Sequence, residues 1–499
     1  MIVGGLTMLS RILGFVRDML IARLFGVDSA TDAFFVAFKI PNFLRRLFTE
    51  GAFTHAFIPV IVEKERQSGM FELKIFLDKS GGSFALIMMS ASVIGMLAAP
   101  ILVVVFAPGF WHSGSPYALS VQMLRIMMPY LFFVASVAFA GAILNARGHF
   151  IGPVFAPVLL NLSMIVGAIE LAPMLEQPVT ALAWSVLFAG FVQLALQLAL
   201  LSRLDVLPRL RWGFGDSGVT SVLRAMGPAV FAVSVTQINL LLDTFMASFL
   251  ETGSVSWLYY SDRLVEFPLG VLGIALSTVI LPKLAQDYIA DNQQAFSKRL
   301  DWGVRLTFLM GLPASVGLAV LAQPVLSTLF QSAQFSTGDV HRAGQSLAAY
   351  AAGLVGFIGI KMLLPGFSSR KDLATPLRFG IYTLVINMLL NLLLIGPLGH
   401  AGLALATSLA AFANAGLLLV KLGEDRIYKP DRGTIVFVLR VCVAVALMGG
   451  GLAYCVDAES WQAQERFEQV LMLTAWIGVG IGLYVATLLL TGMRLRHVV

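Results

Sequence analysis

Residues Val470 to Leu490 read VLMLTAWIGVGIGLYVATLLL, an apolar run that holds no charged residue. A helix rises about 1.5 Å per residue, so roughly 20 such residues cross a bilayer hydrocarbon core of about 30 Å. Runs of the same kind occur at Phe84–Phe106 and Ala181–Leu201. Isolated strands would leave backbone groups unpaired in lipid, so these runs predict membrane-spanning helices.

The composition agrees with a chain embedded in membrane. Of its 499 residues, 58% are hydrophobic and only 12% are charged, whereas an ordinary soluble domain is about 25% charged. The two cysteines, Cys442 and Cys455, share one late apolar segment, and the histidines are scattered, so neither a disulfide framework nor a catalytic metal site is expected. Arg11 interrupts the first apolar run, which has no basic start, so no cleavable signal peptide is expected.

Apolar windows separated by turn signals predict an all-α polytopic membrane protein with about 14 transmembrane helices. Their expected limits are 2–25, 31–62, 81–107, 121–146, 151–171, 178–202, 218–250, 254–282, 302–325, 343–368, 374–396, 400–421, 434–455 and 468–492.

Basic residues gather in alternate loops of this arrangement. They are Lys64, Arg66, Lys74 and Lys79, then Arg147, then Arg203, Arg209 and Arg211, then Lys283, Lys298 and Arg299, then Arg370 and Lys371, then Lys421, Arg426, Lys429 and Arg432. The opposite loops contain only Arg342 and Arg466. Because positively charged loops stay cytoplasmic, both termini are predicted to be cytoplasmic. The same loops account for a pI near 9.3, so nucleic-acid binding is not expected.

The chain also repeats itself. Asp18–Ala22 (DMLIA) resembles Asp243–Ala247 (DTFMA), and the spacing of Arg147 and Pro153 recurs in Arg370 and Pro376. The related elements are an even number of spans apart, which predicts two parallel six-helix repeats with a substrate site between them, as in many transporters. The expected division is 1–202 for the N-terminal half, 203–421 for the C-terminal half and 422–499 for an extra C-terminal helix pair.

Charged residues inside the predicted spans carry most of the functional information. A charge facing lipid at mid-bilayer costs about 2.5–3.5 kcal/mol on insertion scales, so this many must line a watery interior or pair with one another. Basic residues outnumber acidic ones, and an excess of positive charge in an enclosed cavity attracts an anion. Arginine forks suit phosphate oxygens particularly well. The set is Arg11, Arg17, Asp18, Arg23, Asp32, Lys39, Arg45, Arg46, Glu50, Arg125, Asp243, Asp262, Arg263, Glu266 and Lys361.

Helical spacing places part of this set on one face. Asp32, Lys39 and Arg46 recur every seven residues, with Glu50 four residues later, and Arg45 lies on a different side of a regular helix. In the eighth span Ser256 and Arg263 share a face, and Glu266 follows at i+3.

Several stretches strongly resemble the MurJ (MviN) family. They are Ser10–Asp18 (SRILGFVRD), Thr31–Asn42 (TDAFFVAFKIPN), Leu44–Phe53 (LRRLFTEGAF), Ser254–Pro268 (SVSWLYYSDRLVEFP) and Leu364–Asp372 (LPGFSSRKD). The resemblance covers essentially the whole chain. It implies the multidrug/oligosaccharidyl-lipid/polysaccharide exporter superfamily, and a lipid II flippase of peptidoglycan and cell wall biogenesis in the bacterial inner membrane, which is a transporter and not an enzyme.

The resemblance also implies a substrate site. The family's cavity arginines correspond to Arg11, Arg17, Arg45 and Arg263, and Asp32, Ser256 and Glu266 fall in matching motifs, so these residues and Lys39 are the predicted substrate-binding set. The resemblance selects Arg45 where helical periodicity favours Arg46. The arginines would hold the pyrophosphate of undecaprenyl-linked lipid II during alternating access, and the last two spans would form a groove for the lipid tail. The oligomeric state is left open by the sequence.

No GxxxxGK[ST] motif occurs in the sequence, so no cofactor is expected and an ion gradient or the membrane potential would drive transport. Matching family positions imply a sodium site at Asp243, Asn387, Asn391 and Thr407. One carboxylate with neutral oxygens suits a hard cation, while hydrogen bonding between helices is the ordinary use of Asn and Thr in membrane bundles.

Three other function classes are weighed against this interpretation. A multidrug-cation exporter of the same superfamily needs an acidic or aromatic cavity, and a flippase for another polyprenyl-linked saccharide would use the same pyrophosphate contacts. A membrane transferase acting on a lipid-linked sugar would need paired acidic residues for metal chemistry, and Asp262 with Glu266 is the only close acidic pair inside a span.

Overall fold

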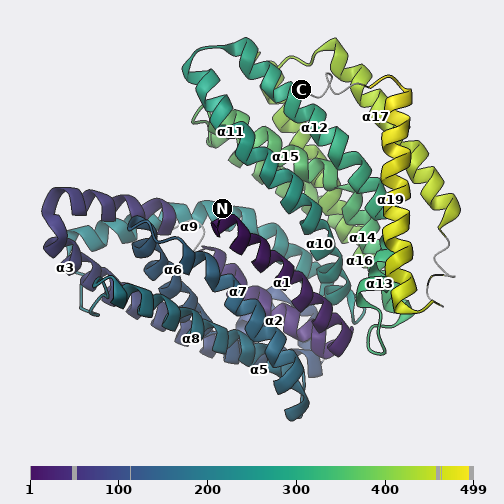
Figure 1. Cartoon of the computed structure of the whole chain (residues 1–499). Helices are drawn as coiled ribbons and strands as arrows, with labels where there is room; N and C mark the ends of the chain where they lie inside the picture. The colour runs from purple at the N-terminus through teal and green to yellow at the C-terminus, as the bar shows by residue number, and fades with distance from the viewer. Residues whose placement is uncertain (1, 48–52, 113, 457–460, 462–463, 494–499) are drawn as a thin grey trace. The chain divides into compact units, whose positions relative to one another are not determined.

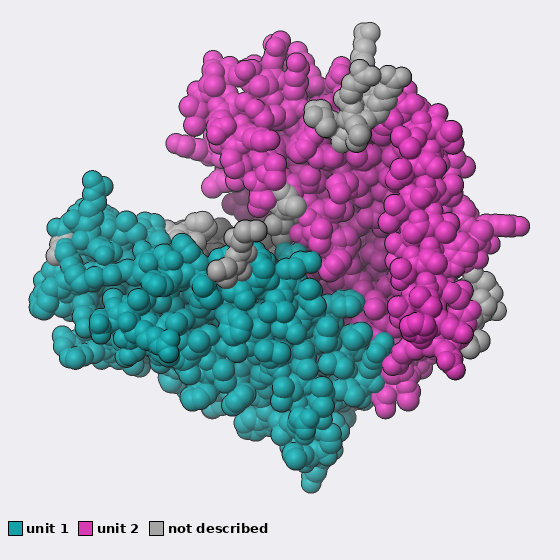
Figure 2. Space-filling view, viewed as in Figure 1, with its two compact units in different colours: residues 1–256 teal, residues 257–499 magenta. Residues whose placement is uncertain are grey.

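A computed structural model describes residues 2–47, 53–112, 114–456, 461 and 464–493. Within these ranges the side chains of 2, 53–56, 68, 112, 228–240, 274–275 and 432 are not described. The described residues form helices and short connections without any strand, which confirms the all-α fold class (Figure 1). Contacts divide the chain into two compact units, Met1–Ser256 and Trp257–Val499 (Figure 2).

The first unit is built from long helices and ends in the first turn of α10. Its elements are α1 (Ile2–Phe25), α2 (Ser29–Arg46), α3 (Phe53–Leu97), α4 (Ala99–Phe106), η2 (Pro108–His112), α5 (Ser115–Met127), α6 (Tyr130–Ala146), α7 (Ile151–Val166), η3 (Gly167–Leu171), η4 (Ala172–Met174), α8 (Thr180–Arg203) and α9 (Ser217–Ala247). Helix α1 packs on α7, α2 on α5, and α3 on α6 and α9.

The second unit continues from α10 to the C-terminus. Its elements are α10 (Ser254–Pro268), η5 (Leu269–Gly273), α11 (Ile274–Ile289), α12 (Gln293–Val320), α13 (Ala322–Phe330), α14 (Thr337–Ala352), α15 (Leu354–Ser368), α16 (Ala374–Glu424), α17 (Arg432–Cys455) and α19 (Arg466–Leu490). Helices α17 and α19 lie side by side and α17 packs on α12.

Among the described residues, 10 helices are long and apolar enough to cross a membrane. Helices α1 and α2 lie outside this set because Arg17, Asp18 and other charges interrupt their apolar runs. The 51-residue helix α16 counts once, although it covers two predicted spans, 374–396 and 400–421. The chain is therefore a multi-pass membrane protein, and the number of 14 crossings stays a prediction.

Glycine marks the bends inside the two longest helices. Gly399 has φ 55° inside α16, and Gly69 has φ 75° inside α3. Residues with a Cβ rarely adopt this left-handed region, so glycine lets the chain change direction there. The bend at Gly399 falls in the predicted turn between two spans.

Several helix boundaries differ from those predicted. Lys64, Arg66, Lys74 and Lys79 were predicted in a loop and lie within α3, and Lys283, Lys298 and Arg299 lie within α11 and α12. The predicted span 31–62 contains the end of α2 and the start of α3, with residues 48–52 outside the described part. Hydropathy reports how much of a helix is apolar, and a helix can continue past that limit into the polar interface.

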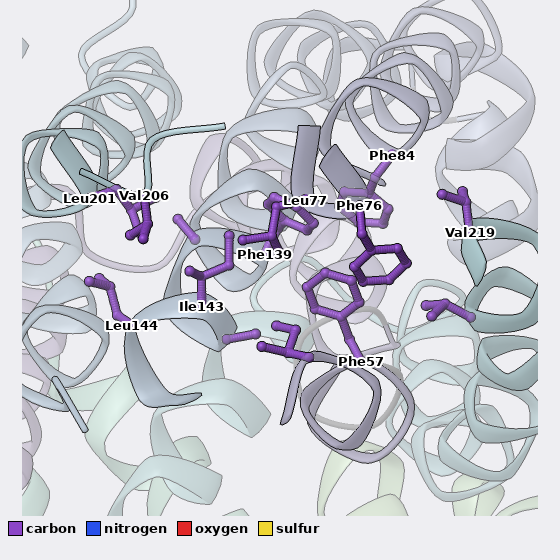
Figure 3. Close-up of a cluster of buried hydrophobic side chains, with 14 of the residues drawn as sticks. Phe57, Phe76, Leu77, Phe84, Phe139, Ile143, Leu144, Leu201, Val206 and Val219 are labelled. Carbon is purple, nitrogen blue, oxygen red and sulfur yellow. The ribbon is translucent and has the colours of Figure 1, made fainter. Parts of the chain in front are cut away.

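Each unit has its own apolar core. In the first, Phe57 of α3 contacts Phe76 and Phe139 at ring-centroid distances of 5.9 and 5.0 Å, beside Val206 and Val219 (Figure 3). In the second, buried residues of α17 and α19 form a cluster with neighbours on α12.

Polar contacts reinforce the attachment of α17 to α12. Buried Asp301 of α12 accepts hydrogen bonds from Thr434 at 2.7 Å and from the Tyr428 hydroxyl at 2.9 Å. Burial, together with the Asp301 carboxylate, raises the pKa of Tyr428 above its ordinary value. The extra helix pair is thus fixed to the second unit by polar as well as apolar contacts.

The compact units do not follow the predicted repeat boundary at 202/203. Helix α9, which begins the predicted second repeat, packs on α3 and α4 and so belongs to the first unit. The predicted repeats rest on similar stretches of sequence, whereas the two compact units are defined by contacts between residues. The contacts therefore do not test the division into 1–202, 203–421 and 422–499, which stays a prediction.

Candidate substrate-binding site

Arg17 is buried in α1 and held on three sides. Its Nε and Nη2 lie 2.9 and 2.7 Å from Oδ1 of Asp18, and its Nη1 lies 3.0 Å from Oδ1 of Asn161 on α7. Asn161 in turn donates to the backbone oxygen of Ser10 at 2.9 Å. Arg17 therefore ties α1 to α7, and it is buried at 7% exposure.

Arg11 occupies a different environment six residues earlier on the same helix. Its side chain is half-buried, and it makes no hydrogen bond or ion pair with any other residue that the structure describes. An arginine in a spanning helix without a protein partner needs water, a lipid phosphate or a bound anion nearby. Arg11 thus remains available to an anionic ligand.

The middle of α2 is buried from Thr31 to Pro41 except at Lys39, and its polar residues contact later parts of the first unit. The carboxylate of Asp32, 3% exposed, accepts from the backbone N–H groups of Gly253 and Ser256 at 2.6 and 2.9 Å. It also accepts from the Ser256 hydroxyl at 2.6 Å. Lys39 Nζ donates to Oγ1 of Thr244 at 2.6 Å. Asp32 and Lys39 therefore both face the segment between Thr244 and Ser256.

The carboxylate of Asp32 caps the N-terminal end of α10. The first N–H groups of a helix have no partner within that helix, and an oxygen acceptor there typically stabilises it by about 1 kcal/mol. Asp32 supplies that acceptor to α10 from a helix more than 200 positions earlier in the chain. Asp32 and Ser256, which the sequence analysis predicts as substrate-binding residues, are thereby brought into direct contact.

Arg45 lies near the C-terminal end of α2. Its Nε donates to Oδ1 of Asn42 at 3.0 Å, and the side chain is partly exposed. Arg46 is also partly exposed, and Glu50, the last member of the predicted stripe, lies outside the described residues. The choice between Arg45 and Arg46 stays with the family resemblance.

Arg263 and Glu266 lie in the second unit, on α10. Arg263 Nη1 is 2.5 Å from Oε2 of Glu266, and its guanidinium lies over the ring of Tyr259, 4.9 Å from the centroid. The two charged side chains are 26% and 43% exposed. Stacking and the carboxylate hold the guanidinium in one orientation while leaving part of it open, which suits an anion-binding group.

Three of the four predicted sodium ligands meet on α16. Asn387 Nδ2 donates to Oγ1 of Thr407 at 3.3 Å, and Asn391 Nδ2 donates to Oδ1 of Asn387 at 3.1 Å. The fourth, Asp243, is a buried residue of the first unit. Within the second unit, Oδ1 of Asn387 and Oγ1 of Thr407 already accept hydrogen bonds, which fits the role of joining the two arms of α16.

The sequence analysis missed Asn161 and Tyr259. Asn161 is the one amide side chain in the fifth span, and a buried polar group of this kind signals an obligatory hydrogen-bond partner. Tyr259 sits four residues before Arg263, a spacing that places the two side chains on the same face of a helix. Both signals were present in the sequence, but neither identified the partner.

Helices α1, α2 and α10 thus each carry arginine side chains that are buried, as Arg17 is, or partly buried, as Arg11, Arg45 and Arg263 are. Within the described residues no group of three or more His, Cys, Asp or Glu is placed to hold a metal ion.

The family model described as lipid II flippase MurJ matches residues 21–471 of this sequence. The chain belongs to the MurJ family.

Curated relatives in the MurJ family match nearly the full length. A probable lipid II flippase MurJ of Vibrio cholerae is 44% identical, covering 99% of this chain and 96% of the relative. The lipid II flippase MurJ of Burkholderia cenocepacia is 38% identical, covering 99% and 97%. These identities confirm the resemblance drawn from the motifs.

Solved structures show the MurJ fold at lower identity. A lipid II flippase MurJ in an inward closed conformation matches with a TM-score of 0.80 at 23% identity, covering 97% of each chain. An inward-facing multidrug resistance MATE family transporter of the MOP superfamily matches with a TM-score of 0.71 at 14% identity, covering 85% of this chain and 97% of that one. The chain thus shares its fold with both a MurJ and a MATE family transporter.

Proposed function

We propose that this protein carries lipid II from the cytoplasmic to the periplasmic leaflet of the bacterial inner membrane, with both termini cytoplasmic. Family membership supports lipid II as the substrate. The observation that supports binding of its pyrophosphate is the partly exposed guanidinium of Arg263, which Tyr259 and Glu266 hold in one orientation. A pyrophosphate cannot cross hydrocarbon unaided because an unpaired charge there is strongly disfavoured. Arginine forks replace its hydration shell with fixed donors.

The proposed mechanism is alternating access with Arg11, Arg17, Arg45 and Arg263 around the pyrophosphate. Rocking of two repeats about a central site would expose that site first to one leaflet and then to the other. Apolar helices α17 and α19 would keep the polyprenyl tail in contact with lipid. A multidrug-cation exporter of the same fold would need anionic groups where this chain carries arginines, so it fits the charges poorly.

The proposed function is tested by depleting the protein in cells and measuring lipid II in each leaflet. We expect lipid II to accumulate on the cytoplasmic face, and expression of the intact chain to restore its appearance on the periplasmic face. Unchanged distribution after depletion would contradict the proposed function. Accumulation of another polyprenyl-linked saccharide alone would redirect it to that substrate.

Replacing Asp32 tests whether its carboxylate restrains the start of α10. Asp32→Asn removes the charge and one strong acceptor from the first turn of α10, and a hydrogen bond to a charged group contributes about 1.5–3 kcal/mol. We expect backbone amides around Gly253 and Ser256 to exchange with deuterium about tenfold faster or more, since about 1.4 kcal/mol corresponds to a factor of 10. Hydrogen exchange followed by mass spectrometry measures this directly.

Asp28→Asn is the matched control for that experiment. Asp28 caps its own helix, accepting from the N–H of Thr31 at 2.7 Å. It should change exchange at the start of α2 and leave α10 as in the parent. Equal exchange of the α10 amides in Asp32→Asn and the parent would show that Asp32 does not restrain α10.

The sodium site at Asp243, Asn387, Asn391 and Thr407 is a separate proposal, and it follows from matching family positions. If the site binds Na⁺, thermal unfolding of the parent should shift upward in sodium relative to potassium, because a ligand that binds the folded state stabilises it. Asp243→Asn should remove the difference. Equal stability of the parent in both salts would assign the amides to hydrogen bonding alone.

A further inference from the structure

The connection between α8 and α9, residues 204–216, is fastened to the first unit although it is not helical. Val206, 6% exposed, belongs to the apolar cluster around Phe57 and Phe139 (Figure 3). At the far end, Lys79 Nζ lies 3.0 Å from Oδ2 of Asp216. The two ends of the connection are thus held by different kinds of contact.

The middle of the connection is fastened to α3 by backbone hydrogen bonds. The N–H groups of Arg209 and Arg211 donate to Oδ1 and the backbone oxygen of Asp78, at 2.7 and 3.1 Å. The N–H of Gly213 donates to Oγ of Ser83 at 3.1 Å. A Cβ added to Gly82 would come within 2.1 Å of the Arg211 backbone oxygen, so the two backbones touch. The connection therefore has a fixed position along α3.

This fixed segment presents large apolar side chains beside arginines. Leu210 is 71% exposed and Trp212 is 74% exposed, although Gly213 next to them is buried. Arg209 is exposed, and the Arg211 side chain is 57% exposed, with Nε 3.8 Å from Oδ2 of Asp78. Exposing a tryptophan and a leucine to water on a fixed segment is unfavourable. We therefore expect an apolar environment to cover Leu210 and Trp212.

The contact with α3 also fixes the depth of the segment in the membrane. It lies at Asp78–Ser83, where the charged residues of α3 end and its apolar run begins. That junction is the level of the bilayer interface, where Trp is enriched and arginine meets lipid phosphates. Residues 207–214 hold Arg209 and Arg211 and no acidic residue, so this part of the connection is net positive, while Asp205 and Asp216 lie on either side of it.

We propose that residues 207–214 form an interfacial anchor that binds the surface of the membrane. Leu210 and Trp212 insert among the lipid headgroups, while Arg209 and Arg211 bind the phosphates of anionic phospholipids. Because the segment is fastened to α3, this contact holds the first unit at a set depth in the bilayer. The proposal does not depend on the transported substrate.

The test uses the full chain in lipid nanodiscs with Cys442 and Cys455 replaced by serine, since both native thiols are exposed. A fluorescent probe is attached through Trp212→Cys, or through Gln294→Cys at the exposed start of α12 as the matched control. We expect lipids that are spin-labelled near the headgroup to quench the fluorescence of the probe at position 212. Iodide dissolved in the water should quench the probe there only weakly. The control should show the opposite pattern.

The identity of the lipid is tested with the same probe. Spin-labelled phosphatidylglycerol should quench position 212 more than spin-labelled phosphatidylcholine, and Arg209→Gln with Arg211→Gln should lower that preference, by up to about fivefold per arginine. Quenching by iodide equal to that at 294, without quenching by lipid, would overturn the anchor and leave this surface to a protein partner. Lipid quenching without any preference for phosphatidylglycerol would overturn the role of the arginines.

Discussion

Replacing Arg263 by alanine is expected to abolish lipid II transport while leaving the folded protein nearly as stable as the parent. The guanidinium would supply charge-assisted hydrogen bonds to the pyrophosphate at about 1.5–3 kcal/mol each, so losing two of them lowers transport about a hundredfold or more. The folded state loses little, because Glu266, with a side chain 43% exposed, stays solvated. Growth of a depletion strain and leaflet-resolved lipid II measure transport, and thermal unfolding measures stability.

Two companion variants sharpen this prediction. Arg263→Lys should restore only part of the transport, since a point charge replaces a planar fork. Lys298→Ala, which removes an exposed charge from the polar start of α12, should change neither transport nor stability. Normal transport by Arg263→Ala at normal expression would contradict a phosphate-binding role for this arginine.

Arg17→Ala is expected to act mainly through the fold. Arg17 and Asp18 are 7% and 3% exposed, and removing the arginine leaves the carboxylate buried without its ion pair and Asn161 without a donor. Breaking a buried pair in this way costs about 3–5 kcal/mol. The variant should therefore accumulate poorly and unfold at a clearly lower temperature, and its loss of transport would follow from that.

The double variant Arg17→Ala with Asp18→Asn separates the two roles of Arg17. Neutralising Asp18 removes the uncompensated charge, so stability should return in large part. If transport stays absent in the stabilised double variant, Arg17 also contacts the substrate. An Arg17→Ala protein as stable as the parent would show that the hydrogen bond from Arg17 to Asn161 is not what holds α1 to α7.

The sequence predicted the helical elements because each depends on local chemistry. A run such as Val470–Leu490 can satisfy its backbone in lipid only as a helix, wherever the rest of the chain lies. The boundaries were less predictable. Lys64 and Lys79 continue α3 where a loop was predicted, because a helix does not have to end where its apolar part ends.

The site was predictable in its residue types but not in its pairings. The cost of a charge inside a span identifies Arg17, Asp32 and Arg263 from the sequence alone. The cost does not show whether water, a ligand or another side chain compensates the charge, so it does not identify the partner of each residue. Asn161 and Tyr259 complete two of these environments. The i, i+4 spacing places Tyr259 on the same helix face as Arg263, but nothing local in the chain assigns Asn161 to Arg17.

By itself, then, the sequence determined that this chain is a helical membrane protein of the MurJ family with arginines placed inside its spans, because hydropathy, helical spacing and motifs are properties of neighbouring residues. Only the tertiary structure decided that Arg17 is buried against Asn161 of α7, that Asp32 caps α10, and that the 204–216 connection is fastened to α3 with Trp212 exposed. Each of these joins residues far apart in the chain, and such contacts depend on how the helices pack.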